Sequence, residues 1–139
     1  MRIFLTIPLL LALVHTAWAD TTNRAKQFSP VPGIFVGGVG LECKSNPPNI
    51  VEFLLLTKDR QRVGLAVFEN DDVTYDFMAI TRTTPRNYIV KQENIEFVLD
   101  RQSLKLTMEQ DYNCAVMSIS DLHNAAKDFL RTLLSENKI

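Results

Sequence analysis

From Ile34 onward the chain consists of short apolar runs separated by residues that favour turns. The runs span residues 34–44, 50–57, 62–69, 73–82, 88–91, 95–99, 104–109 and 112–118. The breaks include Asn46-Pro47-Pro48 and Asn70-Asp71-Asp72, which favour local turns over strand pairing. Short apolar runs at this spacing are typical of strands joined by hairpins. We therefore expect a mainly β fold, in which an antiparallel meander curls into a sandwich or a half-open barrel.

Two of the runs also indicate which faces of the sheet are buried. Ile95, Phe97 and Leu99 alternate with polar positions such as Glu96, a pattern typical of strands with one wet face. Residues 51–56 are apolar except for Glu52, so we expect this strand to be covered on both faces. A second layer is needed to cover it.

The last segment has the spacing of a helix. Ser120 can cap its start, and its apolar residues recur at intervals of three and four: Leu122, Ala126, Phe129, Leu130 and Leu133. The spacing predicts an α-helix over about 121–136 that packs on the sheet and gives an α+β fold. A membrane-surface helix is the alternative. The mixture of Asp128 and Glu136 with Lys127 and Arg131 on its polar face argues against it.

The start of the chain predicts export. Arg2 precedes an apolar stretch over residues 3–14, and Ala17-Trp18-Ala19 places small residues where a signal peptidase cuts. The apolar stretch is shorter than the roughly 20 residues that a membrane span needs. We expect residues 1–19 to be a cleaved signal peptide, residues 20–33 a flexible segment, and residues 34–139 a single domain that works in the periplasm or is secreted.

Two cysteines follow the predicted cleavage site, Cys43 and Cys114. An even number of cysteines in an exported chain predicts a disulfide, although two buried thiols are the alternative. Each cysteine shares a strand face with apolar neighbours, so both sulfurs should point inward. A bridge closing so long a loop stabilises a fold by roughly 4 kcal/mol in the chain-entropy model.

Charge and composition exclude several classes of ligand. Without residues 1–19 the chain keeps 14 basic and 16 acidic side chains, with no basic cluster of the kind that binds nucleic acid. Glu69, Asp71, Asp72 and Asp76 surround a turn, but their spacing does not match a calcium loop. We expect no metal or cofactor. The glycines at 37, 38 and 40 lack the phosphate-loop spacing and indicate a bulge or a close backbone approach, at a place that lies under the helix.

No catalytic constellation is predicted. After the signal the only histidine is His123, which shares the first helical turn with Ser120 and Asp121. A catalytic relay needs its base between separate partners, and three residues crowded at one helix start do not provide this. We interpret His123 as a solvated or capping-turn residue. A hydrolase that uses scattered carboxylates stays a third hypothesis for function, because paired acids can arise in three dimensions.

One surface is a candidate partner site. Cations near the turns, together with one tyrosine, form a predicted rim: Arg60, Arg62, Arg82, Arg86, Tyr88 and Arg101. Arg and Tyr are frequent in interface hot spots. We therefore expect a non-enzymatic binding module that recognises a protein or envelope component. The alternative is a carrier that holds a small apolar ligand inside a half-open barrel.

The last third of the chain resembles a group of small exported proteobacterial proteins without an assigned role. The resemblance rests on residues 95–101 (IEFVLDR), on Leu104-Lys105-Leu106 and on Tyr112-Asn113-Cys114. It implies export and a shared fold, and it carries no catalytic residue to this chain. Small β-rich lysozyme inhibitors of bacterial envelopes also share size, export and disulfide use, but their serine- and glycine-rich loop motif has no counterpart here.

Overall fold

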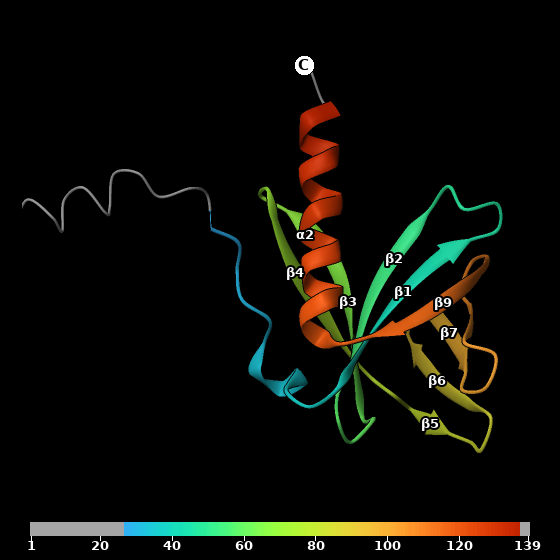
Figure 1. Ribbon diagram of the computed structural model, residues 1–139. Coiled ribbons are helices and arrows are strands. Elements are labelled where there is room, and N and C mark those ends of the chain that lie inside the picture. Colours follow the sequence, from blue (N-terminus) through green and yellow to red (C-terminus); the bar gives the residue numbers. More distant parts are fainter. Residues whose placement is uncertain (1–26, 137–139) are drawn as a thin grey trace, which may run out of the picture.

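The computed structural model describes residues 27–136 (Figure 1). The predicted signal peptide, its cleavage site and the first part of the predicted flexible segment lie outside the described residues. Within residues 27–136 the chain forms one antiparallel sheet and one α-helix. The elements are η2 (Gly33–Phe35, a 3-10 turn), β1 (Val39–Ser45), β2 (Val51–Leu56), β3 (Arg62–Glu69), β4 (Asp72–Ala79), β5 (Arg82–Thr83), β6 (Asn87–Gln92), β7 (Ile95–Asp100), β8 (Lys105–Thr107), β9 (Asp111–Met117) and α2 (Ile119–Glu136).

The sheet consists of two meanders that meet at β1. Its strand order is β4-β3-β2-β1-β9-β8-β7-β6-β5, so β9 returns to pair with β1 while β4 and β5 form the two ends. The ends are joined by Ile80 and Thr81, whose N–H groups donate to Gln61 on one side and to Ile89 on the other, each at 2.9 Å. The sheet is therefore curled into a half-open barrel that closes only at this corner, which confirms the predicted mainly β fold.

Two apolar cores occupy the two faces of this sheet. The inner core fills the curled interior and contains Leu41, Cys43, Leu54, Leu56, Val63, Met78, Val90, Phe97, Leu99, Leu106 and Tyr112. The helix core lies between the sheet and α2 and contains Phe35, Phe53, Leu55, Ala66, Val73, Tyr75, Leu122, Ala126 and Leu130. Because successive residues of a strand face opposite sides, β2 contributes to both cores. The prediction that this strand is covered on both faces is confirmed.

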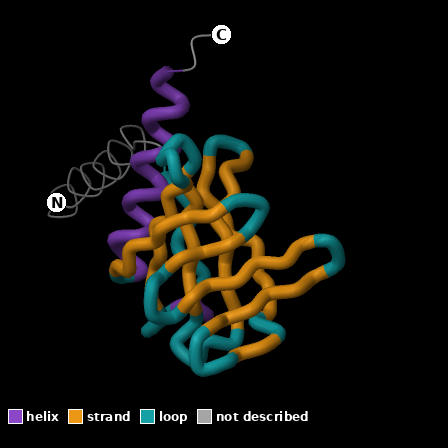
Figure 2. Tube along the Cα trace, turned by 90° about the vertical axis from the view of Figure 1, so that its right-hand side faces the viewer, coloured by secondary structure: helices purple, strands orange, loops and turns teal. Residues whose placement is uncertain are grey.

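Helix α2 packs across one face of the sheet, as predicted, and its last turns extend past the strands (Figures 1 and 2). It begins at Ile119, and Ser118 rather than Ser120 caps it, because the Ser118 hydroxyl accepts the N–H of Asp121 at 3.0 Å. Leu133, expected on the packed face, is exposed. The close approach expected at the glycines is confirmed at Gly40, where an added Cβ would lie 2.3 Å from the Cβ of Leu122.

The structure corrects the predicted start of the first strand. Residues 33–35 form the 3-10 turn η2, and β1 starts only at Val39. Gly37 has a φ of +80°, which bends the chain, and the backbone of Gly38 packs so closely on Leu56 that no Cβ fits there. The bend lets Phe35 turn inward and become completely buried in the helix core.

Residues 27–33 belong to the packed unit. Phe28 and Val31 pack against the helix core, and both the N–H and the hydroxyl of Ser29 donate to the carboxylate of Asp72. The sequence assigned these residues to a flexible segment because two prolines and polar neighbours offer little to bury. The contacts that hold them come from β4 and α2, which lie far away in the sequence.

Candidate functional site

The disulfide forms as predicted. The sulfurs of Cys43 and Cys114 are 2.05 Å apart, and the two residues stand directly opposite each other in β1 and β9. Cys43 is completely buried in the inner core. The bridge therefore ties the two meanders together where they meet, and it indicates an oxidising compartment.

No helix within residues 27–136 is long and apolar enough to cross a membrane.

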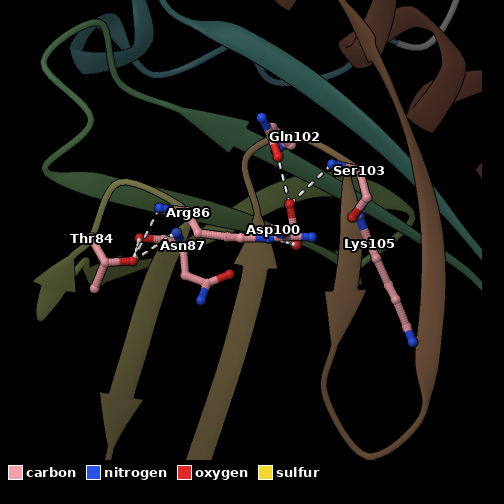
Figure 3. A network of polar contacts seen from close by, with 7 residues as sticks. All are labelled: Thr84, Arg86, Asn87, Asp100, Gln102, Ser103 and Lys105. Carbon is pink, nitrogen blue, oxygen red and sulfur yellow. Dashed lines mark hydrogen bonds and ion pairs between the residues drawn. The ribbon is translucent and has the colours of Figure 1, made fainter.

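Three residues of the predicted rim, Arg86, Tyr88 and Arg101, lie at or beside the turns that flank β6 and β7. Figure 3 shows the contacts of Arg86 and Asp100 there. Arg86 forms an ion pair with Asp100 at 2.8 Å, while the guanidinium of Arg101 lies 4.7 Å from the ring centre of Tyr88 and donates to the carbonyl of Thr84. The N–H of Ser103, the guanidinium of Arg86 and the N–H of Gln102 hold the pKa of Asp100 well below its usual range. These two arginines thus brace the turns.

The other rim cations lie elsewhere. Arg60 lies in the β2–β3 turn and donates to the carbonyl of Thr57 at 2.8 Å, and Arg62 begins β3 next to that turn. Arg82 is exposed on the short strand β5, and no ion pair in residues 27–136 involves it. The structure therefore does not gather the six rim residues into one surface.

A cleft of about 710 Å³ lies where the barrel stays open, a volume within the range of ligand sites. One wall comes from β2 to β4 and the other from the β6–β7 hairpin and the β8–β9 turn. It is lined by Glu52, Leu65, Asp76, Phe77, Met78, Gln92, Asn94, Ile95, Glu96, Phe97, Met108, Glu109 and Tyr112. Met78, Phe97 and Tyr112 belong to the inner core, so the cleft opens directly onto it. Phe77 and Ile95 are 47% and 52% exposed.

The charged residues that line the cleft are all acidic. They are Glu52, Asp76, Glu96 and Glu109, and none of the ion pairs in the described part of the chain involves any of them. Glu52 alternates with Leu54 and Leu56 on the inner face of β2 and is half-buried. Burial raises the pKa of the Glu52 carboxyl. Within residues 27–136 the cleft thus combines an apolar floor with acidic side chains that form no ion pair.

The acidic group predicted around the β3–β4 turn is split by the fold. Asp72 accepts hydrogen bonds from Ser29, whereas Asp76 faces the cleft from the inner side of β4. No group of three or more His, Cys, Asp or Glu residues among those described could hold a metal ion. The sequence offered a half-open barrel that holds a ligand as an alternative, but it did not identify the residues that line this cleft. The signal that could have found it is Glu52, a single acid inside an apolar strand.

The structure corrects the interpretation of His123 as a solvated residue. Its side chain is 93% buried. Its Nδ1 accepts from the Tyr75 hydroxyl at 2.8 Å, and its Nε2–H donates to the Ser29 carbonyl at 3.0 Å. Burial lowers the pKa of His123 and raises that of Tyr75. His123 faces β4 and the residues before β1, so it joins three segments and forms no relay with Ser120 and Asp121.

Comparison of the chain with protein families, with characterised proteins and with solved structures finds no match. The resemblance of the last third to small exported proteins therefore stays a prediction. Hypotheses about function rest on the geometry of this structure.

Proposed function

We propose that this chain is an exported, non-enzymatic binding module and that its partner enters the cleft between β4 and the β6–β7 hairpin. The observation that carries the proposal is the cleft of about 710 Å³, with its exposed Phe77 and Ile95. Apolar pockets with a few polar groups at their walls are the usual form of a binding site. The curled sheet supplies a rigid frame, because its two meanders are joined by the disulfide.

Export through a signal peptide over residues 1–19 and work in the periplasm or outside the cell belong to this proposal. The disulfide supports it, because such bridges persist in oxidising compartments. Mass spectrometry of the protein from its exporting host tests it. A chain that begins at Asp20 is the expected result, and a chain that retains residues 1–19 contradicts it.

Photo-crosslinking in the exporting host tests the binding site. A photoreactive amino acid is placed at Ile95 in the cleft, at Arg82 on the predicted rim, or at the exposed Asn124 on α2 as a control. We expect one discrete adduct from position 95 and none from position 124. An adduct from position 82 alone would indicate that the partner binds at the predicted rim and not in the cleft. The absence of any specific adduct would contradict the binding module.

A carrier of a small apolar ligand is the second candidate, favoured by the buried Phe97 and Met78 at the floor of the cleft. It predicts that the protein extracted from its host retains a small molecule under native mass spectrometry. It also predicts a higher melting temperature with ligand bound. Leu65→Trp, which places a large ring in the cleft, should abolish that retention.

A hydrolase is the third candidate. The cleft is lined by both Glu52, whose pKa burial raises, and Asp76, and hydrolases of glycosides use two carboxyl groups as acid and base. This candidate predicts that Glu52→Gln and Asp76→Asn each abolish turnover of a glycoside substrate. If the unaltered protein turns over no substrate of a glycoside panel, the hydrolase candidate is contradicted and the binding module stays the preferred proposal.

A further inference from the structure

We propose that the cleft binds an extended, cationic peptide segment of a partner protein, which adds as a strand to the free edge of β4. This inference rests on the proposed binding function and specifies its partner. It is carried by two independent features of residues 27–136: strand edges beside the cleft that no other strand pairs with, and acidic side chains in the cleft that form no ion pair.

Along the edge of β4 that borders the cleft, some backbone groups pair with no strand of residues 27–136. In an antiparallel ladder, alternate residues direct their N–H and C=O groups toward the same neighbour. The N–H of Ile80 donates to the carbonyl of Gln61, which directly precedes β3. The backbone N–H and C=O groups of Met78 and Asp76 therefore also point toward β3. The backbone groups of Phe77 and Ala79 then point away from β3, toward the cleft side. Thr81 lies on that same side and donates across the corner to β6, where the barrel closes.

The edge of β6 is open over its second half. Its ladder with β5 covers only Tyr88 and Ile89, and the carbonyl of Ile89 is already used by Thr81. By the same alternation, Lys91 directs its backbone groups toward the gap, and no ladder in residues 27–136 pairs with it there. Phe77 and Gln92 line opposite walls of the cleft. Unpaired edges of this kind are templates for an added strand.

Charge complementarity determines the chemistry of that strand. Glu52, Asp76 and Glu109 line the cleft without an ion-pair partner in the described chain. Glu96 has a cation close by, because it stands opposite Lys91 in the β6–β7 ladder. The acids belong to both walls, so more than one cation is needed to neutralise them. A peptide with several Lys or Arg side chains meets that requirement.

Alternation along the added strand matches the two faces of β4. Side chains on the inner face would lie near Asp76, with their aliphatic stems over Met78 and the buried core. Side chains on the outer face would lie beside Phe77, which is 47% exposed. A segment that alternates cationic and apolar residues satisfies both faces. The amide side chains of Gln92 and Asn94 can bond the peptide backbone.

The test uses the protein purified from its exporting host and three capped hexapeptides. The first alternates Lys and Val, the second alternates Glu and Val, and the third is the Lys-Val peptide with alternate backbone nitrogens methylated to block strand pairing. Isothermal titration calorimetry measures affinity, and amide NMR shifts of Phe77 and Ala79 locate the bound peptide. Asp76→Asn is the cleft variant. Glu69→Gln, which removes an exposed acid from the tip of the same hairpin, is its matched control.

We expect the Lys-Val peptide to bind, the Glu-Val peptide not to bind, and methylation to weaken binding about tenfold or more. Asp76→Asn should weaken it about fivefold, and Glu69→Gln should leave it unchanged. Equal binding of both charge types would overturn the cationic partner, and equal binding of the methylated peptide would overturn strand addition. If no peptide binds, the inference is wrong. An adduct at position 95 would still support the binding module, whereas its absence would contradict that as well.

Discussion

The two faces of the sheet are built from the same strands, but one face is covered by a helix and the other is partly open. On the helix side, α2 closes the core, and the polar groups buried there are paired, as His123 is with Tyr75 and Ser29. On the inner side the curled sheet stays open between β4 and β6, and within residues 27–136 the acids at that opening form no ion pair. Of these acids Glu52 is half-buried, and its burial disfavours the charged carboxylate, whereas Asp76, Glu96 and Glu109 are exposed. This difference supports our proposal that a partner binds on the inner side.

The largest expected effect concerns the disulfide between β1 and β9, which joins the two meanders. Replacing Cys43 and Cys114 with Ala should lower the free energy of unfolding by roughly 4 kcal/mol, because the bridge closes a long loop between β1 and β9. Urea unfolding with and without reductant measures it. The double variant should not respond to reductant. A loss of well under 1 kcal/mol would mean that strand pairing alone holds the meanders together.

Truncating one core residue on each face compares their packing. Leu122 is completely buried beneath α2, so Leu122→Ala should lower the free energy of unfolding by about 3 kcal/mol. Met78 lies at the floor of the open cleft, where neighbouring side chains and water can relax into the space. Met78→Ala should cost about 2 kcal/mol. Equal losses in urea unfolding would show that the cleft is packed as tightly as the helix core.

The paired histidine predicts a hydrogen-bond effect on the helix side. Tyr75→Phe removes the hydroxyl that donates to Nδ1 of the buried His123 and should lower the free energy of unfolding by about 1–3 kcal/mol. Tyr88→Phe is the matched control, since the ring of Tyr88 contacts Arg101 and its hydroxyl takes no part in that contact. Thermal unfolding compares the two variants. Similar melting temperatures would indicate that a water molecule replaces the lost donor.

The same histidine predicts how the helix side responds to acid. Burial lowers the pKa of His123 below its ordinary 6.5, so the unfolded chain binds the proton more readily than the folded protein. Its contribution to stability is complete above pH 6.5 and falls as the pH drops below that value. We expect a smaller effect than that of Tyr75→Phe. Unfolding between pH 7.5 and 5 should show it, and His123→Gln should abolish that part of the pH dependence.

The cleft predicts the smallest effect, with the opposite sign. Burial raises the pKa of Glu52, so its contribution to stability is lost as the pH rises through its folded pKa. Glu52→Gln should therefore stabilise the protein at pH 7, by less than about 1 kcal/mol because water screens a half-exposed carboxyl. The melting temperature of this variant, compared with that of Glu69→Gln, measures it. Destabilisation by Glu52→Gln would mean that Glu52 has a structural partner in the fold.

Local patterns were sufficient for the elements but not for their arrangement. Alternation of side chains located most of the strands, and the doubly covered run at residues 51–56 predicted a second layer. These patterns wrongly placed Phe35 in the first strand. Nothing in its neighbouring residues indicates that the chain bends after it and buries its ring in the helix core. The patterns also failed at His123, because its partners Tyr75 and Ser29 are 48 and 94 positions away in the sequence. A local pattern contains no information about contacts of that range.

The sequence by itself determined the mainly β class, the helix near its C-terminal end and the pairing of Cys43 with Cys114, because periodicity and cysteine parity are local or countable properties. Only the tertiary structure decided that the barrel stays open between β4 and β6, that acids from separate segments line one cleft with an apolar floor, and that Arg86 and Arg101 brace turns. The physical reason is strand register and curl, which follow from the packing of both cores at once.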